Sequence, residues 1–268
     1  MNEIPHTIHG FTADHLARLN SATQYPSILT YHALGERGRL TEDRTTDFST
    51  VNPDDVEVTE KIDGTNARII IPPRRMGGAL IGSRTELLHY VHDLIPNPAQ
   101  GIVEAIKDAA WRVTPLLAEL DDLVVVFGEV YGGKTSSGAK NYSTTGRVGF
   151  RVFDVATVPL DVLGWERDRI ASWRDSGGQE FVRSDVLAQV AEDCGLALVP
   201  LLTAGTPPVS VADTHAWLTA ALVETFAGLD DSGKGRPEGV VVRTADRSLI
   251  AKIRFEDYER TAKSRRAA

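Results

Sequence analysis

Two strand-like segments joined by a tight turn, at residues 56–71, constrain the fold of this chain more than any other feature. VEVTEKI alternates apolar and polar residues, and ARIII resumes a strand-like pattern after Asp63-Gly64. Alternation with a period of two is typical of a β-strand, and Asp-Gly favours a tight turn. The sequence therefore predicts two strands here, with Lys61 near the end of the first.

Other segments predict a mixture of strands and helices. Strands are expected at about 79–83, 123–130 and 148–155, with a closing hairpin at 240–243 and 249–254. Helices are expected at 12–20, from Asn97-Pro98 through Ile102, Val103, Ile106 and Ala110 up to an interruption at Pro115, at 184–194 before Gly195, and from Ser210 to near Gly228. Residues 35–55 are polar and predict a loop. Because strands and helices do not alternate regularly, we expect an α+β fold with antiparallel sheets flanked by helices.

Bulk properties narrow the class of protein without identifying a function. The 268 residues carry a formal net charge of −8, which argues weakly against nonspecific nucleic-acid binding. The lone Cys194 excludes an internal disulfide and a multi-cysteine zinc site. No stretch approaches the roughly 18–20 apolar residues of a membrane span, and the first residues do not resemble a secretory signal. We therefore expect a cytoplasmic protein without a membrane partner.

Lys61 is the first candidate for chemistry. A lysine that ends a strand before an acid and a glycine turn can act as an amine nucleophile, once its proton is lost from an ordinary pKa of about 10.4. Taken alone, these residues are better explained by an ordinary hairpin turn. The choice between the two interpretations depends on the rest of the chain.

Five later blocks follow Lys61-Ile62-Asp63-Gly64-Thr65-Asn66 in order. They are Gly82-Ser83-Arg84-Thr85, Phe127-Gly128-Glu129-Val130-Tyr131-Gly132, Gly149-Phe150-Arg151-Val152-Phe153-Asp154, Pro237-Glu238-Gly239-Val240-Val241-Val242-Arg243 and Ala251-Lys252-Ile253-Arg254. The series, over about residues 56–255, resembles the covalent nucleotidyltransferase superfamily of ATP-dependent DNA ligases, RNA ligases and mRNA capping enzymes. The motif around Glu60 and Lys61 is most similar to the RNA ligase 2-like branch from phages.

This resemblance implies a ligase adenylylation fold and an ATP-dependent RNA ligase activity. Lys61 is expected to attack the α-phosphorus of ATP and form a lysyl-AMP. The AMP then passes to an RNA 5′-phosphate, and a 3′-hydroxyl displaces it to seal the strand during RNA repair. We expect residues 1–268 to form one catalytic domain, with 1–55 as an N-terminal extension packed on it and no C-terminal OB domain.

The resemblance also implies roles for individual side chains. Glu238 is expected to act in catalysis and to bind Mg²⁺ or Mn²⁺, and Lys252 to act in catalysis by gripping the α-phosphate. The expected nucleotide-binding residues are Glu60, Ile62, Asn66, Arg84, Glu129, Phe150, Glu238, Lys252 and Arg254. Phe150 is expected to stack on adenine, and Glu129 to hold the ribose. Arg254 stands where many relatives carry a second lysine, so its charge is kept but its shape differs.

Several alternatives stay open at this stage. A DNA ligase, a capping-type nucleotidyltransferase and an inactive relative that only binds nucleotide or RNA share much of the same pattern. The first two typically have a C-terminal OB domain. The residues after Arg254 are too few for such a domain, which favours the RNA ligase interpretation. An end-healing kinase or phosphatase is a further expected partner, beside RNA with 5′-phosphate and 3′-hydroxyl ends.

Two other motifs have simpler explanations. Residues 128–135 match the P-loop pattern, but a P-loop must open a helix, and the following residues predict a loop. That loop, with Lys134, Lys140, Tyr142 and Arg147, either contacts RNA or is simply solvated. His89 and His92 are spaced for metal binding on a helix, yet no third ligand is evident.

Overall fold

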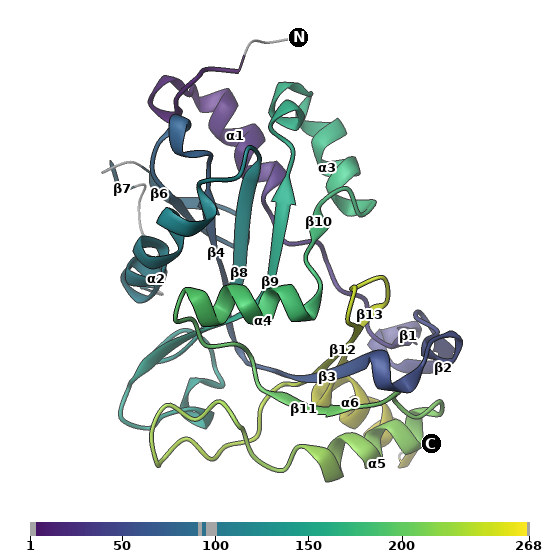
Figure 1. The fold of residues 1–268 in the computed structure, drawn as a ribbon. Helices are drawn as coiled ribbons and strands as arrows, with labels where there is room; N and C mark the ends of the chain where they lie inside the picture. The colour runs from purple at the N-terminus through teal and green to yellow at the C-terminus, as the bar shows by residue number, and fades with distance from the viewer. Residues whose placement is uncertain (1–3, 91–92, 95–100, 267–268) are drawn as a thin grey trace. The chain divides into compact units, whose positions relative to one another are not determined.

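The chain forms two compact units in the computed structural model, which describes residues 4–90, 93–94 and 101–266. Unit 1 comprises residues 1–27, 65–130 and 148–198, and unit 2 comprises residues 28–64, 131–147 and 199–268. The predicted α+β class with antiparallel sheets and flanking helices is confirmed (Figure 1). None of the helices formed by the described residues is long and apolar enough to cross a membrane.

Unit 1 is built on a seven-stranded sheet in the order β10-β9-β8-β4-β5-β6-β7. The pairs β10-β9, β4-β5, β5-β6 and β6-β7 are antiparallel. Its strands are β4 (Gly64–Ile71), β5 (Leu80–Ser83), β6 (Leu87–Tyr90), β7 (Asp93–Leu94), β8 (Leu123–Gly132), β9 (Val148–Val158) and β10 (Glu180–Phe181). Neighbours in this order are consecutive strands of the sequence, except that β8 lies beside β4.

Helices pack on both faces of this sheet because consecutive residues of its central strands are apolar, and consecutive residues point to opposite faces. One face, including Ile69 and Val126, packs against α2 (Ile102–Leu117) and α4 (Ser184–Asp193). The opposite face, including Ile70 and Phe127, packs against α1 (Ala13–Ala22) and α3 (Arg167–Asp175). β4 and β8 are thus buried on both sides.

Unit 2 contains a four-stranded antiparallel sheet in the order β11-β3-β12-β13 and a small β1-β2 ribbon. The bounds are β1 (His32–Leu34), β2 (Leu40–Arg44), β3 (Val56–Lys61), β11 (Leu201–Ala204), β12 (Gly239–Thr244) and β13 (Ile250–Arg254). The helices α5 (Val211–Ala221) and α6 (Phe255–Arg266) belong to this unit. The core of the unit joins one face of this sheet, including Val58, Val240 and Ile253, to Leu218 of α5 and Tyr258 of α6.

Several elements differ from the prediction. Residues 35–55 were expected to be a loop, but they contain β2 and short 3₁₀ turns, because Leu40 and Phe48 are buried in the core of unit 2. The helices α3 and α6 were not predicted, and α5 ends at Ala221 instead of near Gly228. Pro115 lies inside α2 without ending it. The expected helix start at Asn97-Pro98 lies outside the described residues.

Candidate active site

Lys61 lies at the end of β3, where strand register brings it level with residues from two neighbouring strands. Lys61 pairs with Gly239 of β12, and Gly239 pairs with Arg254 of β13. Two residues further along, the next row on the same face contains Lys252, opposite Val241. Because paired residues and residues two apart share a face of a sheet, Lys61, Lys252 and Arg254 project to the same side.

Glu60 lies on the opposite face of the same sheet. It pairs with Val240, which is part of the core, and only 1% of its surface is exposed. Its carboxylate accepts hydrogen bonds from the Thr225 hydroxyl at 2.5 Å and the Phe226 amide at 2.7 Å. The carboxylate thereby anchors residues 225–226 to the sheet.

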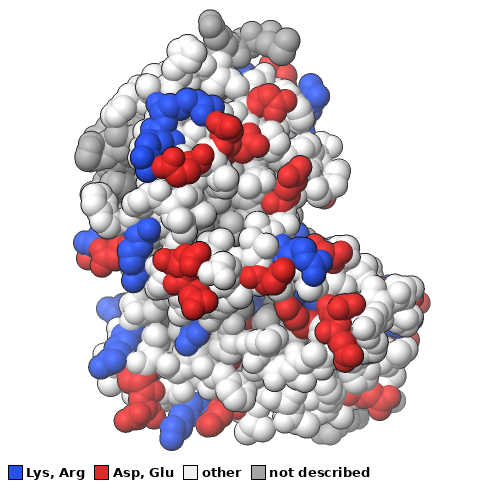
Figure 2. Space-filling model, viewed as in Figure 1, with Lys and Arg blue, Asp and Glu red and all other residues white. Residues whose placement is uncertain are grey.

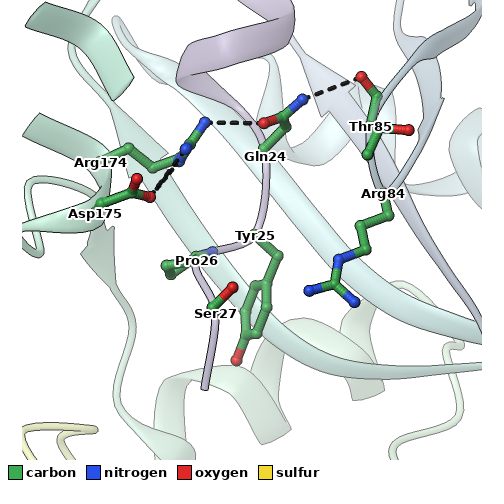
Figure 3. Close-up of a pocket in the computed structure, with 8 residues that line it drawn as sticks. All are labelled: Gln24, Tyr25, Pro26, Ser27, Arg84, Thr85, Arg174 and Asp175. Atoms are coloured by element: carbon green, nitrogen blue, oxygen red, sulfur yellow. Dashed lines mark hydrogen bonds and ion pairs between the residues drawn. The ribbon is translucent and has the colours of Figure 1, made fainter. Parts of the chain in front are cut away.

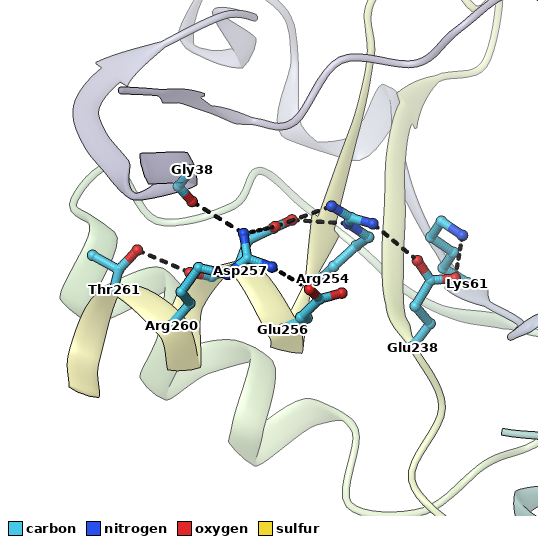
Figure 4. Close-up of polar contacts among 8 residues, drawn as sticks. All are labelled: Gly38, Lys61, Glu238, Arg254, Glu256, Asp257, Arg260 and Thr261. Carbon is cyan, nitrogen blue, oxygen red and sulfur yellow. Dashed lines mark hydrogen bonds and ion pairs between the residues drawn. The ribbon is translucent and has the colours of Figure 1, made fainter. Parts of the chain in front are cut away.

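Glu238, immediately before β12, connects the basic residues on the site face. It forms an ion pair with Lys61 and a second, at 3.6 Å, with Arg254 (Figure 4). About a quarter of each of the three side chains is exposed, so these charges are only partly solvated. Lys61 must leave this ion pair before its amine can attack as a nucleophile.

Asp257, in the first turn of α6, was not identified from the sequence. Its carboxylate accepts hydrogen bonds from Nε of Arg254 at 2.8 Å and from Nη2 at 3.0 Å, and it is 1% exposed (Figure 4). Two parallel hydrogen bonds to one guanidinium hold its plane and direction. The feature of the sequence that could have indicated this contact is an acid three residues after Arg254. Side chains at this spacing lie close together when the chain enters a helix.

The turn after Lys61 is hydrogen-bonded to the loop that follows β8. The Tyr142 hydroxyl accepts a hydrogen bond of 2.7 Å from the Asp63 amide, and the Ser136 hydroxyl donates to the Asp63 carbonyl at 3.0 Å. Ile62 is 3% exposed and packs in the same cluster as Tyr142. Burial raises the pKa of the Tyr142 hydroxyl, with the charges of Glu60 and Asp63 adding to the effect.

Two expectations about this loop are therefore resolved. Tyr142 is fully buried, so it is not available to stack on an RNA base as one interpretation required. Residues 133–138 form turns instead of opening a helix, so the P-loop pattern has no P-loop structure.

Of the histidine pair, His92 lies outside the described residues, and nothing is described of the His89 side chain.

In unit 1, Arg84 follows β5 on a turn that is fixed by a buried arginine. Arg68 donates hydrogen bonds to the carbonyl of Ser83 at 2.5 Å and to that of Arg84 at 3.0 Å. Gly82 makes room for this side chain, because a Cβ there would lie 3.0 Å from Nε of Arg68. Arg84 itself is exposed.

Glu129 and Phe150 occupy opposite faces of the unit 1 sheet. A Cβ on Gly128 would lie 2.3 Å from the Phe150 ring, so this ring covers the face toward which residue 128 points. Glu129, the next residue on β8, points to the other face. Phe153 packs with Tyr25 and Phe127 on that other face, with ring centroids 5.0 Å apart for Tyr25 and Phe153. The two phenylalanines of the predicted block are thus separated by the sheet.

Asn66, on β4, has an unsatisfied acceptor. Its Oδ1 atom is buried and has no hydrogen-bond partner among the described residues. Buried polar atoms are normally satisfied, so a donor from a water molecule or a ligand is expected to complete this one.

The donor set is compatible with a divalent cation held by one protein carboxylate. The described residues contain no cluster of three or more His, Cys, Asp or Glu side chains suited to a metal ion. Mg²⁺ commonly uses one or two carboxylates together with substrate phosphates and water. On the face drawn in Figure 2, basic and acidic side chains are intermixed, so recognition of an anionic substrate depends on local sites.

A family model described as RNA ligase matches residues 54–264. A search of curated proteins found no significant match.

Solved structures of RNA ligases share the fold at low identity. Naegleria gruberi RNA ligase with PPi is 15% identical with a TM-score of 0.52, over 89% of this chain and 64% of that chain. A mutant of that ligase with ATP and Mn is 14% identical with a TM-score of 0.51, over 90% and 62%. An archaeal ATP-dependent RNA ligase is 17% identical with a TM-score of 0.51, over 88% and 49%.

This chain therefore spans less than two thirds of the length of these matched ligases. Their likeness shows that this chain shares their fold over the matched region. The family match covers most of the chain and includes Lys61, Glu238 and Lys252. The chain belongs to the RNA ligase family.

Proposed function

We propose that the protein is an ATP-dependent RNA ligase that works through a covalent lysyl-AMP. The observation that carries this proposal is the convergence of Lys61, Lys252 and Arg254 on one face of a sheet, with Glu238 in contact with Lys61 and Arg254. Related structures add support, since a mutant of Naegleria gruberi RNA ligase was solved with ATP and Mn and the ligase was also solved with PPi.

In the first step, the lone pair of Lys61 Nζ forms a bond to the α-phosphorus of ATP. The bond from that phosphorus to the oxygen bridging to the β-phosphorus breaks, and pyrophosphate leaves. Glu238 touches Nζ and is the group suited to accept its proton. Lys252 and Arg254 supply positive charge next to the phosphate oxygens, which lowers the energy of the charged transition state.

Other side chains are proposed to bind the nucleotide. Glu129 would hold the ribose, Arg84 a phosphate or ribose oxygen, and Asn66 would complete its unsatisfied hydrogen bond. Phe150 lies on the opposite face of the sheet from Glu129, so the expected stacking of Phe150 on the adenine of the same nucleotide is not proposed. Glu60 and Ile62 would act through the shape of the turn, since both are buried. A bound Mg²⁺ or Mn²⁺, held by Glu238, would neutralise triphosphate charge.

The substrate is proposed to be RNA with a 5′-phosphate and a 3′-hydroxyl. The AMP passes from Lys61 to the 5′-phosphate, and the 3′-hydroxyl then attacks that phosphate and releases AMP. We further propose that both units act as one catalytic domain, with residues 1–55 as part of it, in a cytoplasmic repair setting. A kinase or phosphatase that prepares RNA ends is a compatible partner.

Labelling with α-labelled ATP and a divalent cation tests the first step. After denaturation, label should remain on the wild-type protein, be released by acid and disappear in Lys61→Ala. Lys234→Ala is the matched control, because Lys234 is an exposed lysine of the same unit. A wild-type protein that takes no label would contradict the proposal.

The choice of nucleotide and strand separates the related functions. Label from ATP but not GTP supports a ligase over a capping enzyme. Joining of nicked RNA or single-stranded RNA, with no joining of nicked DNA, supports RNA as the substrate. Joining of nicked DNA alone would replace the proposal with a DNA ligase.

A further inference from the structure

A polar pocket of about 280 Å³ lies in unit 1, beside the turn that carries Arg84 (Figure 3). Its walls come from three places: the segment after α1, the turn after β5 and the end of α3. The lining residues are Gln24, Tyr25, Pro26, Ser27, Arg84, Thr85, Arg174 and Asp175. Arg174 and Gln24 belong to none of the sequence blocks described above.

Arg174 is held firmly at this pocket by neutral groups and one acid. It donates to the Ser21 carbonyl at 2.8 Å and the Gln24 side-chain oxygen at 2.9 Å, and it pairs with Asp175 at 2.9 Å. Gln24 in turn donates to the Thr85 carbonyl at 3.0 Å, which links the two sides of the pocket (Figure 3). A guanidinium fixed in this way loses little conformational freedom when it binds an anion.

A second positive charge is buried behind the pocket. Arg68 is fully buried, has no carboxylate partner among the described residues, and its Nε has no hydrogen-bond partner there. Burial, together with the charge of Arg174, lowers its pKa to about 9, so it remains a cation at neutral pH. A buried charge without a counter-ion is costly, which indicates that the site is built for an anion.

Positive charge exceeds negative charge around this pocket. Arg68, Arg84 and Arg174 are opposed by Asp175 and by Asp154, whose carboxylate accepts a 2.5 Å hydrogen bond from the Tyr25 hydroxyl. The side chain of Arg84 has no partner among the described residues and is exposed, so it can turn to a ligand.

We infer that this pocket binds a backbone phosphate of the RNA strand, with Arg174 and Arg84 as its two charged contacts. The inference rests on the proposed function and adds Arg174, which is not among the proposed nucleotide-binding residues, while Arg84 would contact both substrates. The chain has a net charge of −8, so a polynucleotide must be held by local basic pockets. Phosphate contacts of this kind position a strand without reading its sequence.

Binding of a fluorescent, 5′-phosphorylated single-stranded RNA to the full chain tests this site, by anisotropy at several salt concentrations. Arg174→Gln should weaken binding about ten-fold and reduce the salt dependence by about one phosphate contact. Thr85→Glu, which adds an acid at an exposed lining position, should also weaken binding without removing a side-chain contact. Asp175→Asn should strengthen binding, because it removes the acid that neutralises Arg174.

The control is Arg75→Gln, an exposed arginine of the same unit that pairs with Asp121 outside the pocket, and its binding should match wild type. Lys61 labelling by ATP should be unchanged in Arg174→Gln. RNA binding that is absent in wild type, or equal in all four variants, overturns the inference. A raised KM for ATP in Arg174→Gln with unchanged RNA binding overturns it as well, since the phosphate would then belong to ATP.

Failure of the proposed function would look different. If Lys61 takes no label but RNA binding still depends on Arg174 and strengthens in Asp175→Asn, the pocket stands and the adenylylation proposal is contradicted. If Lys61 is labelled and these variants bind RNA as the wild type does, the ligase proposal stands and the inferred role of the pocket is wrong.

Discussion

Asp257 holds Arg254 through two hydrogen bonds, and the same guanidinium lies 3.6 Å from Glu238, the partner of Lys61. The buried acid of α6 is thereby connected to the nucleophile through two intervening side chains. Asp257 touches no proposed substrate atom, so it is a positioning residue. Its expected contribution is the direction of the Arg254 side chain.

We expect Asp257→Asn to slow Lys61 labelling about ten-fold, because the charged, two-point contact with Arg254 is lost. The change should fall mainly on the rate constant and little on the KM for ATP, since Arg254 remains present. Single-turnover labelling measures both quantities. Glu259→Gln, a change on the same helix, should label at the wild-type rate. An equal loss in that control would point to a general effect on α6.

Glu60→Ala should destabilise the protein by about 3 kcal/mol, because the carboxylate binds the Thr225 hydroxyl and the Phe226 amide in a buried place. Urea denaturation measures the free energy of unfolding. Glu256→Ala, at an exposed glutamate of α6, should leave it within experimental error of wild type. Unchanged stability in Glu60→Ala together with weaker ATP binding would instead favour a direct nucleotide contact.

Stability should fall in acid because of His32. This side chain is fully buried, and its Nε2–H donates to the Val209 carbonyl at 2.8 Å while Nδ1 accepts from the Tyr258 hydroxyl at 2.6 Å. Burial lowers its pKa below 6.5, with smaller opposing effects from the Val209 carbonyl and Glu42. The unfolded chain therefore binds the proton first. Stability from His32 is complete above about pH 6.5 and is lost as the pH falls through the lowered pKa.

Urea denaturation of wild type and His32→Gln between pH 7.5 and 5.5 measures this effect. Wild type should lose at most about 1.4 kcal/mol per pH unit more than the variant below pH 6.5. Identical pH profiles for the two proteins would show that His32 does not titrate differently on folding.

Gly128→Ala should destabilise the protein by about 1–3 kcal/mol, because the new Cβ would lie 2.3 Å from the Phe150 ring and 2.6 Å from the Arg151 carbonyl. Thermal unfolding measures the change. Gly78→Ala is the control, since a Cβ there meets nothing within 4 Å and the residue has no positive φ. Equal melting temperatures for both variants would mean that the Phe150 ring moves aside without a loss of stability.

Patterns local in sequence predicted much of this molecule. Alternation around Lys61 predicted β3 and β4, and runs of β-branched residues predicted β8 and β12. The antiparallel arrangement is confirmed, as is membership of the RNA ligase family, which motif order had indicated. These features depend on spacing within short segments, which a sequence displays directly.

Features that depend on contacts between distant segments were not predictable. Glu60 neighbours Lys61 in sequence, yet strand alternation sends its side chain into the core, where Thr225 meets it. Helix α6 was missed because its residues are mostly polar, and it is held by a few buried side chains such as Tyr258. The pocket of Arg174 joins three segments that share no sequence signal.

The chain passes between the two units five times, after residues 27, 64, 130, 147 and 198. Each unit is consequently assembled from three separate stretches, and no single cut in the gene yields either one whole. One passage lies inside the motif that carries Lys61, four residues before Arg68. Neither unit can accordingly be expressed alone as one continuous segment, and exchanging one unit with that of a relative would require five coordinated splice points.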